Sequence, residues 1–300
     1  MIVARGLTKR YGSVTAVDDL SFTVRPGVVT GFLGPNGAGK STTMRLMLGL
    51  DHGAGRTEFD GRSFGELAHP ARTVGVMLDA RAVHPGRTAR AHLRMIAAGS
   101  GLPADRVDQA LERVGLLDVA DRRAGGFSMG MSQRLGLAGA LLGNPQALML
   151  DEPANGLDPE GVRWLRDLLK ALAAEGRTVF VSSHLLNEMA VLADALVVIG
   201  QGRLVAAETT GSFVARNSRP EVLVRPADPG LLAELLGRAG FQAAGQPDGT
   251  LLVATNDTDA IATIAMRAGI VLRELTVRHN SLEDAFFAAT AGVAHYRGKA

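Results

Sequence analysis

The chain has 300 residues, a length that allows one large or two modest domains with buried cores. A formal net charge of +2 gives no electrostatic case for a nucleic-acid partner, and the lack of cysteine excludes disulfides and thiolate zinc sites. No run of about 18 apolar residues occurs, so we expect a soluble chain for which any membrane role needs a partner.

The first part of the chain predicts strands that lead into a glycine-rich loop. Residues 2–4 and 20–24 have the composition of short strands, and residues 28–33 form an apolar, β-branched run typical of a buried strand. Residues 34–42 follow directly and match the pattern G-x-x-x-x-G-K-[ST], after which residues 43–50 have helical spacing. A strand, a glycine turn and a helix N-terminus create an anion site, so we expect a nucleoside triphosphate there.

Each residue of this loop is a candidate phosphate contact. Lys40 would reach the β- and γ-phosphates, and the Ser41 hydroxyl would ligate Mg²⁺. The alternative is a flexible glycine turn that binds no ligand. The candidate phosphate-binding residues are Gly34, Pro35, Asn36, Gly37, Ala38, Gly39, Lys40, Ser41 and Thr42.

The middle of the chain changes from strands to helices. Residues 57–62 indicate a hairpin tip with an Asp-Gly turn, and residues 73–78 a strand that ends at Asp79. Residues 85–126 are rich in Ala, Leu and Arg and have helical spacing over 89–98 and 104–114, which predicts a helical insert. Ser128 is suited to cap a further helix, whose N-terminus would be a second anion site.

Two adjacent carboxylates follow the next strand. Residues 147–150 predict a buried strand that runs into Asp151 and Glu152. We expect Asp151 to hold Mg²⁺ and Glu152 to polarise the attacking water as a general base. The alternative is a pair of acidic residues that cap the following helix.

The domain then continues with helices and strands in alternation. Asp158 and Pro159 are typical of a helix start, and that helix should reach about residue 174. Residues 178–182 predict a strand, followed by His184 and a helix to about residue 193. Residues 195–199 and 203–206 predict the last strands of this domain.

The C-terminal part predicts a separate small domain. Residues 217–220 are typical of a linker. The strands expected at 221–225, 241–244, 250–254 and 270–277, with helices at 229–239 and 257–268, give the order βαββαβ. A capped helix from Ser281 to about residue 291 follows. We therefore expect a ferredoxin-like α+β domain.

Together these motifs resemble the ATP-binding subunit of an ABC transporter. Besides the phosphate loop and the two carboxylates, Phe127-Ser128-Met129-Gly130-Met131 resembles the family signature Leu-Ser-Gly-Gly-Gln and keeps its serine and second glycine. The form Ser-x-Gly-Met is similar to drug and antibiotic exporter ATPases of the daunorubicin and bacitracin type. Residues 281–287 are similar to tails in the same group.

The resemblance implies an α/β fold, a P-loop NTPase core with an antiparallel β subdomain, a helical subdomain and a C-terminal α+β domain. It implies an ATPase domain at residues 1–210, with the helical subdomain at about 85–145, and an accessory domain at 211–300.

The resemblance also implies further site residues. Tyr11 would stack on adenine, Asp158 ends the D-loop segment Asn155-Gly156-Leu157-Asp158 near the nucleotide, and His184 would be the switch histidine. Asp79 stands where the family has a glutamine. Its carboxylate could reach Mg²⁺ or a water bound to Mg²⁺, or it could only cap the helical insert.

Two copies should pair head to tail by this resemblance. Each ATP, with Mg²⁺, would lie between residues 34–42 of one copy and Ser128 and Gly130 of the other. A separately encoded membrane permease would convert ATP-driven closing and opening into export of a drug, antibiotic or lipid-like compound. The ATPase would then lie in the cytoplasm, against the inner face of the cell membrane, with no nucleic acid involved.

Three other classes of protein remain as alternatives. An ABC importer ATPase with a C-terminal regulatory domain is the nearest, but the Ser-x-Gly-Met signature and the tail favour an exporter. ABC proteins acting on ribosomes or DNA resemble paired cassettes or carry coiled-coil or zinc insertions, which this sequence lacks. A P-loop kinase or GTPase does not explain the second anion site.

Overall fold

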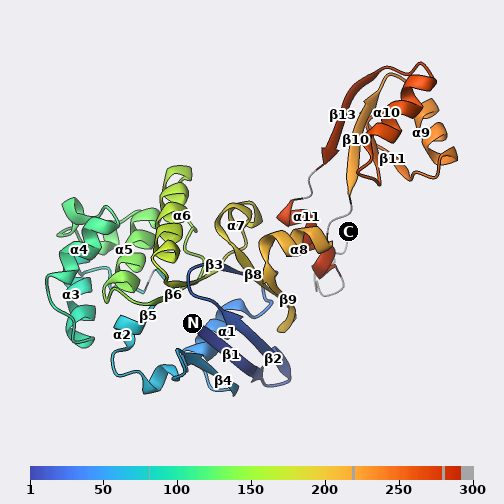
Figure 1. Cartoon of the computed structure of the whole chain (residues 1–300). Helices are drawn as coiled ribbons and strands as arrows, with labels where there is room; N and C mark the ends of the chain where they lie inside the picture. Colours follow the sequence, from blue (N-terminus) through green and yellow to red (C-terminus); the bar gives the residue numbers. More distant parts are fainter. Residues whose placement is uncertain (81, 218–219, 279–280, 292–300) are drawn as a thin grey trace. The chain divides into compact units, whose positions relative to one another are not determined.

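Figure 1 shows the computed structural model, which describes residues 1–80, 82–217, 220–278 and 281–291. The chain divides into two compact units, one built from Met1–Phe213 with the chain from Thr290 onward and the other from Val214–Ala289. In the described ranges, no helix has both the length and the apolar character that a membrane span needs.

The first unit begins with a three-stranded antiparallel sheet. Its strands are β1 (Ile2–Tyr11), β2 (Val14–Val24) and β4 (Ala54–Phe59), in the order β2-β1-β4. β1 and β2 are longer than the sequence predicts, because polar side chains alternate with the buried apolar ones along both strands. β4 ends at the expected Asp60-Gly61 turn, where both residues have positive φ angles of 49° and 85°.

A six-stranded sheet forms the centre of this unit. Its order is β5-β6-β7-β3-β8-β9; the first five strands are parallel, and β9 is antiparallel to β8. The strands are β3 (Val29–Leu33), β5 (Val74–Met77), β6 (Ala147–Leu150), β7 (Thr178–Ser182), β8 (Ala195–Gly200) and β9 (Arg203–Thr209). The predicted α/β P-loop fold is confirmed.

Helix α1 (Lys40–Met47) lies between the two sheets. Its buried Met44 and Met47 join one apolar core with residues of both sheets. Three phenylalanines link the sheets in this core: the ring centroids of Phe22 and Phe32 are 5.9 Å apart, and those of Phe32 and Phe180 are 5.0 Å apart. This core therefore holds α1 against both sheets.

The opposite face of the central sheet is covered by α6 (Pro159–Ala174) and α7 (Leu186–Leu192). Side-chain alternation along β3 shows the two faces: Phe32 joins the core around α1, whereas a Cβ at Gly31 would meet Met189 of α7. Asp158 caps α6, as predicted, by accepting a hydrogen bond from the Gly161 N–H at 2.8 Å.

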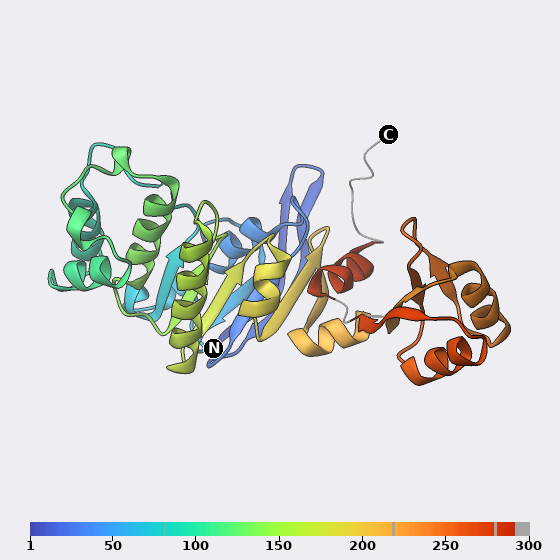
Figure 2. The same ribbon diagram turned by 90° about the horizontal axis from the view of Figure 1, so that it is seen from above.

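A helical end of the unit follows β5. Figures 1 and 2 show α3 (Ala89–Gly99), α4 (Arg106–Arg113) and α5 (Met129–Leu141) gathered beside the β5 edge of the central sheet. Ser128 caps α5, as predicted, by accepting a hydrogen bond from the Met131 N–H at 3.2 Å. The shorter helical segments of the unit are η1 (Phe64–Glu66), α2 (Pro70–Thr73), η2 (Leu117–Val119) and η3 (Ala124–Gly126).

The second unit has its own antiparallel sheet and apolar core. The strand order is β11-β12-β10-β13, and two helices pack on one face. The elements are β10 (Glu221–Pro226), α9 (Pro229–Arg238), β11 (Ala243–Gly245), β12 (Leu251–Val253), α10 (Thr258–Arg267), β13 (Leu272–Arg278) and α11 (Leu282–Thr290).

Helices α2 and α8 (Thr210–Asn217) were absent from the sequence prediction. Helix α8 follows β9 directly, where we expected only a chain leading to the linker. Its threonine and glycine at the start are weak helix formers, and only Phe213 is buried, so the apolar periodicity is short. Ser218 and Arg219 of the predicted linker lie outside the described residues.

Candidate active site

The glycine-rich loop joins β3 to α1 and curls around the start of the helix. Gly37 and Gly39 have φ angles of 80° and 102°, which residues with a side chain rarely adopt. No side chain caps α1, because its N-cap is Gly39. The first amides of α1 therefore face the cavity described below without a competing side-chain acceptor, an arrangement that suits phosphate oxygens.

Lys40 is the buried cation of this loop. Its side-chain ammonium donates hydrogen bonds to the carbonyl oxygens of Gly34 at 2.7 Å and Pro35 at 3.5 Å. Burial lowers the pKa of Lys40, and the charges of Glu152 and Asp151 oppose that shift. An anion in this position would favour the charged ammonium and replace the two carbonyl contacts.

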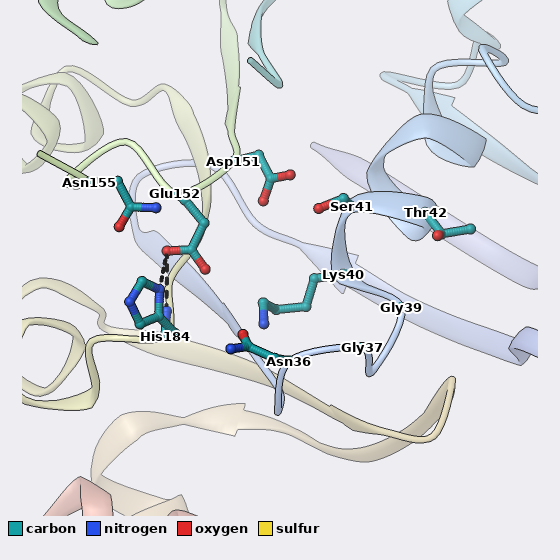
Figure 3. Close-up of a pocket in the computed structure, with 10 residues that line it drawn as sticks. All are labelled: Asn36, Gly37, Gly39, Lys40, Ser41, Thr42, Asp151, Glu152, Asn155 and His184. Atoms are coloured by element: carbon teal, nitrogen blue, oxygen red, sulfur yellow. Dashed lines mark hydrogen bonds and ion pairs between the residues drawn. The ribbon is translucent and has the colours of Figure 1, made fainter. Parts of the chain in front are cut away.

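The two carboxylates follow β6, and a histidine follows β7. The His184 Nδ1 lies 2.7 Å from Glu152 Oε2, and the His184 backbone N–H donates to the same oxygen at 3.3 Å. Both contacts fix one oxygen of Glu152. The carboxylate is thereby placed between the histidine and the glycine-rich loop (Figure 3).

Two residues that the sequence analysis did not single out hold this segment. The Ser182 hydroxyl accepts a hydrogen bond from the Glu152 N–H at 2.9 Å and donates one to Asp151 Oδ1. The Gln133 side-chain amide donates to the Glu152 carbonyl oxygen at 2.8 Å. The sequence pattern could have indicated Ser182, because this residue ends the strand predicted at 178–182. That strand is a parallel neighbour of β6, so the ends of the two strands lie at the same edge of the sheet.

These residues surround one cavity of about 410 Å³. Figure 3 shows Lys40, Asp151 and Glu152 around the same space. The residues that line it are Asn36, Gly37, Gly39, Lys40, Ser41, Thr42, Asp151, Glu152, Asn155 and His184. Among the expected site residues, the structure thus brings together most of the glycine-rich loop, both carboxylates and the histidine.

The donor set suits a triphosphate accompanied by a cation. The lining holds one cationic side chain, Lys40, and two carboxylates, so an unaccompanied triphosphate would meet net repulsion. Ser41 and Asp151 offer the hydroxyl and carboxylate oxygens that Mg²⁺ binds. Across the described ranges, no group of three or more acidic or histidine side chains could hold a metal alone. Mg²⁺ at a nucleotide needs only one or two such groups, because phosphates and water complete its shell.

Eight expected site residues lie outside this cavity lining: Gly34, Pro35, Ala38, Asp79, Tyr11, Ser128, Gly130 and Asp158. The Tyr11 hydroxyl donates to Asp51 Oδ2 at 3.2 Å, and the Lys9 ammonium lies 4.8 Å from the centre of the Tyr11 ring. Ser128 and Gly130 are at the start of α5, and Asp158 is at the start of α6. Ser128 is solvent-exposed in the single chain.

Asp79 lines a second, adjoining cavity of about 170 Å³. Asp151, Glu152 and Asn155 line both cavities, while Gln133 and Met129 line only the second. Asp79 is therefore placed on the α5 side of the carboxylates, and Ser41 on the α1 side.

Comparison with protein families finds a match to the ABC transporter family over residues 17–155. Residues 220–283 of the second unit match a domain family of unknown function.

Individual proteins resemble the chain over most of its length. An uncharacterised ABC transporter ATP-binding protein of Bacillus subtilis, YhcH, is 35% identical over 291 residues, covering 95% of this chain and 94% of that protein. The bacitracin transport ATP-binding protein BcrA of Bacillus licheniformis is 42% identical over 209 residues, or 68% of each chain. A solved ATP-binding cassette, dimeric in a post-hydrolysis state with ADP and phosphate, has a TM-score of 0.63 and 23% identity over 70% of this chain and 98% of that one.

Proposed function

Because the chain belongs to the family of ABC transporter ATP-binding proteins, we propose that its ATP hydrolysis powers export of a small molecule through a separate membrane permease. One observation carries the chemical part of this proposal. Lys40, Asp151, Glu152 and His184 come from three different strand ends and line one cavity together with the glycine-rich loop. Such a set can bind a triphosphate on one side and hold a general base on the other.

The residues of this cavity have distinct roles in the proposed reaction. The loop amides and Lys40 bind the β- and γ-phosphates, and Lys40 exchanges its bonds to the Gly34 and Pro35 carbonyls for phosphate oxygens. Glu152 accepts a proton from the attacking water, and His184 orients its carboxylate. Mg²⁺, held by Ser41 and Asp151, would neutralise charge on the phosphates when bound.

We further propose that the working unit is a head-to-tail pair of chains. Ser128 and Gly130 lie at a helix N-terminus suited to an anion, yet neither lines the cavity of its own chain. In a head-to-tail pair they would face the phosphate of the neighbouring copy, with Tyr11 against the adenine and Asp158 near the interface. The dimer reported for a cassette of the same fold, with ADP and phosphate, supports this assembly.

Export is favoured by the relatives. BcrA, 42% identical over the matched region, is named for bacitracin transport. A permease that binds this chain would place it at the inner face of the membrane. We propose that the first unit is the ATPase domain and the second an accessory domain.

Substitution of Glu152 tests the proposed chemistry. Glu152→Gln should keep ATP binding and lower turnover by about 10²–10⁴-fold, the usual contribution of a general base. Lys40→Ala should instead weaken ATP binding. Glu160→Gln is the matched control, because Glu160 is an exposed carboxylate in the first turn of α6 that does not line the cavity. Phosphate release at wild-type rates from Glu152→Gln would remove Glu152 from the role.

Co-purification tests the transport part. The tagged chain should be recovered from membranes with a protein of several membrane spans, and vesicles carrying both should accumulate substrate only with hydrolysable ATP. If the chain hydrolyses ATP but no such partner is recovered, the proposed ATPase activity would stand and the proposed role in export would be contradicted.

A further inference from the structure

The backbone of Glu152 adopts a conformation that disfavours its residue type. Its φ angle is 50°, in the left-handed region. Asp19, Asp60, Asn144 and Gln201 share this region. The short polar side chains of the first three tolerate it better than glutamate does, and Gln201 lies in the turn between β8 and β9. A strained residue at a candidate site persists only where its surroundings hold it, so the contacts around the Glu152 peptide are informative.

Ser182 holds the backbone N–H of Glu152. Its hydroxyl has one hydrogen, which it donates to Asp151 Oδ1, and it uses a lone pair to accept the Glu152 N–H at 2.9 Å. Ser182 is fully buried at the end of β7. A single hydroxyl thus connects the two carboxylate residues to the neighbouring strand.

The carbonyl side is held by Gln133 from another element. Gln133 lies on the second turn of α5, and its amide donates to the Glu152 carbonyl oxygen at 2.8 Å. Only 8% of Gln133 is exposed, although it is polar and lies on a helix. The side chain therefore has a specific partner and is not directed to solvent.

We propose that Gln133 and Ser182 are positioning residues for ATP hydrolysis. They hold the backbone of Glu152 in the left-handed region and so direct the Glu152 carboxylate into the phosphate cavity. The inference rests on the proposed role of Glu152 as general base. If either hydrogen bond is lost, the peptide can relax toward the ordinary right-handed or extended regions, and the carboxylate leaves its place beside His184.

Gln133 separates this role from metal and nucleotide binding. It does not line the phosphate cavity, and its one hydrogen bond named above goes to the Glu152 backbone. Ser182 is less selective, because it also contacts Asp151, a proposed Mg²⁺ ligand. We therefore expect Gln133 substitution to change turnover alone, and Ser182 substitution to change turnover and Mg²⁺ dependence.

The experiment compares Gln133→Met, Ser182→Ala and the matched control Ser183→Ala in the full chain. Methionine keeps the length and helix preference of Gln133 but removes the donor. Ser183 is also buried, but its hydroxyl accepts from the Leu185 N–H, at the start of the chain that leads to α7. We expect kcat to fall by about 10–100-fold in the first two variants, the effect of slight misplacement of a catalytic group, with little change in the control.

A double-mutant cycle with Glu152→Gln distinguishes positioning from a merely structural role. Single-turnover hydrolysis and ATP affinity are measured for each single and double variant, and thermal unfolding shows that each is folded. If Gln133 acts through Glu152, Gln133→Met should cost little further rate once Glu152 is Gln, and ATP affinity should stay unchanged in both backgrounds.

The outcomes separate this inference from the proposed function. Wild-type turnover in Glu152→Gln would refute the general base itself. A large loss in Glu152→Gln with wild-type turnover in both Gln133→Met and Ser182→Ala would refute only the positioning role. Equal losses from Gln133→Met in the presence and absence of the Glu152 carboxylate would also refute it, because they would show an effect independent of that carboxylate.

Discussion

A negative charge at the start of α5 should abolish hydrolysis without unfolding the protein. Ser128 is exposed, and its hydroxyl caps α5 by accepting the Met131 N–H. Aspartate caps helices as well as serine does, so Ser128→Asp keeps the cap and adds only the charge. Asparagine also caps a helix and is neutral, which makes Ser128→Asn the matched control.

The size of the effect follows from the proposed head-to-tail pairing. If the residue lies about 4 Å from a phosphate oxygen of the neighbouring copy, two unit charges repel by about 4 kcal/mol at an effective dielectric constant near 20. That repulsion corresponds to about 10³-fold in the equilibrium for ATP-dependent closure. Ser128→Asp should therefore have very low ATPase activity, while Ser128→Asn should stay close to wild type and both should unfold at the wild-type temperature.

Mixing this variant with Lys40→Ala tests whether Ser128 serves the other copy. A mixed dimer contains one composite site with both halves intact and one with both halves altered. Random pairing makes about half of the dimers mixed, so activity should recover to about a quarter of wild type if the sites work independently. Heterodimers isolated with two different affinity tags that remain inactive would refute assembly of the site from two chains.

Three further predictions concern other residues. Asp79→Gln, compared in a Glu152→Gln background, should make ATP affinity less dependent on Mg²⁺, because a carboxylate repels triphosphate that lacks the metal. The measurement is the ratio of the ATP affinities with Mg²⁺ and with EDTA, and an unchanged ratio would show that Asp79 does not act on the nucleotide. His92 is buried, and burial, helped by the charge of Arg87, lowers its pKa below the ordinary 6.5. Below pH 6.5 the unfolded chain therefore binds a proton at this histidine that the folded chain does not. The free energy of unfolding should decrease as the pH is lowered, by at most about 1.4 kcal/mol per pH unit from this group. His92→Leu should remove that part of the pH dependence in denaturant titrations, and identical pH profiles would contradict it. Phe180→Ala removes the ring that contacts Phe22 and Phe32 between the sheets, and it should lower the free energy of unfolding by about 3–5 kcal/mol. A loss below about 1 kcal/mol in denaturant titrations would show that the core rearranges to fill the cavity.

The parts of the fold with local signals could be predicted from the sequence. Residues 147–150 and 178–182 are short apolar runs, and the structure has strands at Ala147–Leu150 and Thr178–Ser182. Asp158 and Ser128 cap the helices they were expected to cap, because a cap depends only on residues three positions apart. The lengths of β1 and β2 were underestimated; in β1, Arg5, Lys9 and Arg10 interrupt the apolar pattern.

Contacts between distant segments were harder to predict. The bond from Gln133 to the Glu152 carbonyl joins residues 19 positions apart on different elements, and a glutamine on a helix is ordinarily exposed. The bond between Tyr11 and Asp51 joins residues 40 positions apart, and nothing in either segment indicates it. Such contacts depend on how the helical segment and the two sheets pack, which hydrophobic periodicity does not specify.

Strand order explains why the cavity lies where it does. β6, β7 and β3 are parallel neighbours, so the segments that follow them leave the sheet at the same edge. The chain leaves β7 toward α7 on the Gly31 face, but leaves β3 toward α1 on the Phe32 face. The two connections diverge, and a crevice opens between the strand ends, the position at which open α/β sheets bind ligands. The glycine-rich loop supplies a phosphate cradle on one side of that crevice. Glu152 and His184 reach its other side because β7 lies next to β3 and β6 lies next to β7, so the sheet order, and not the loop motif, supplies the groups that we propose for hydrolysis.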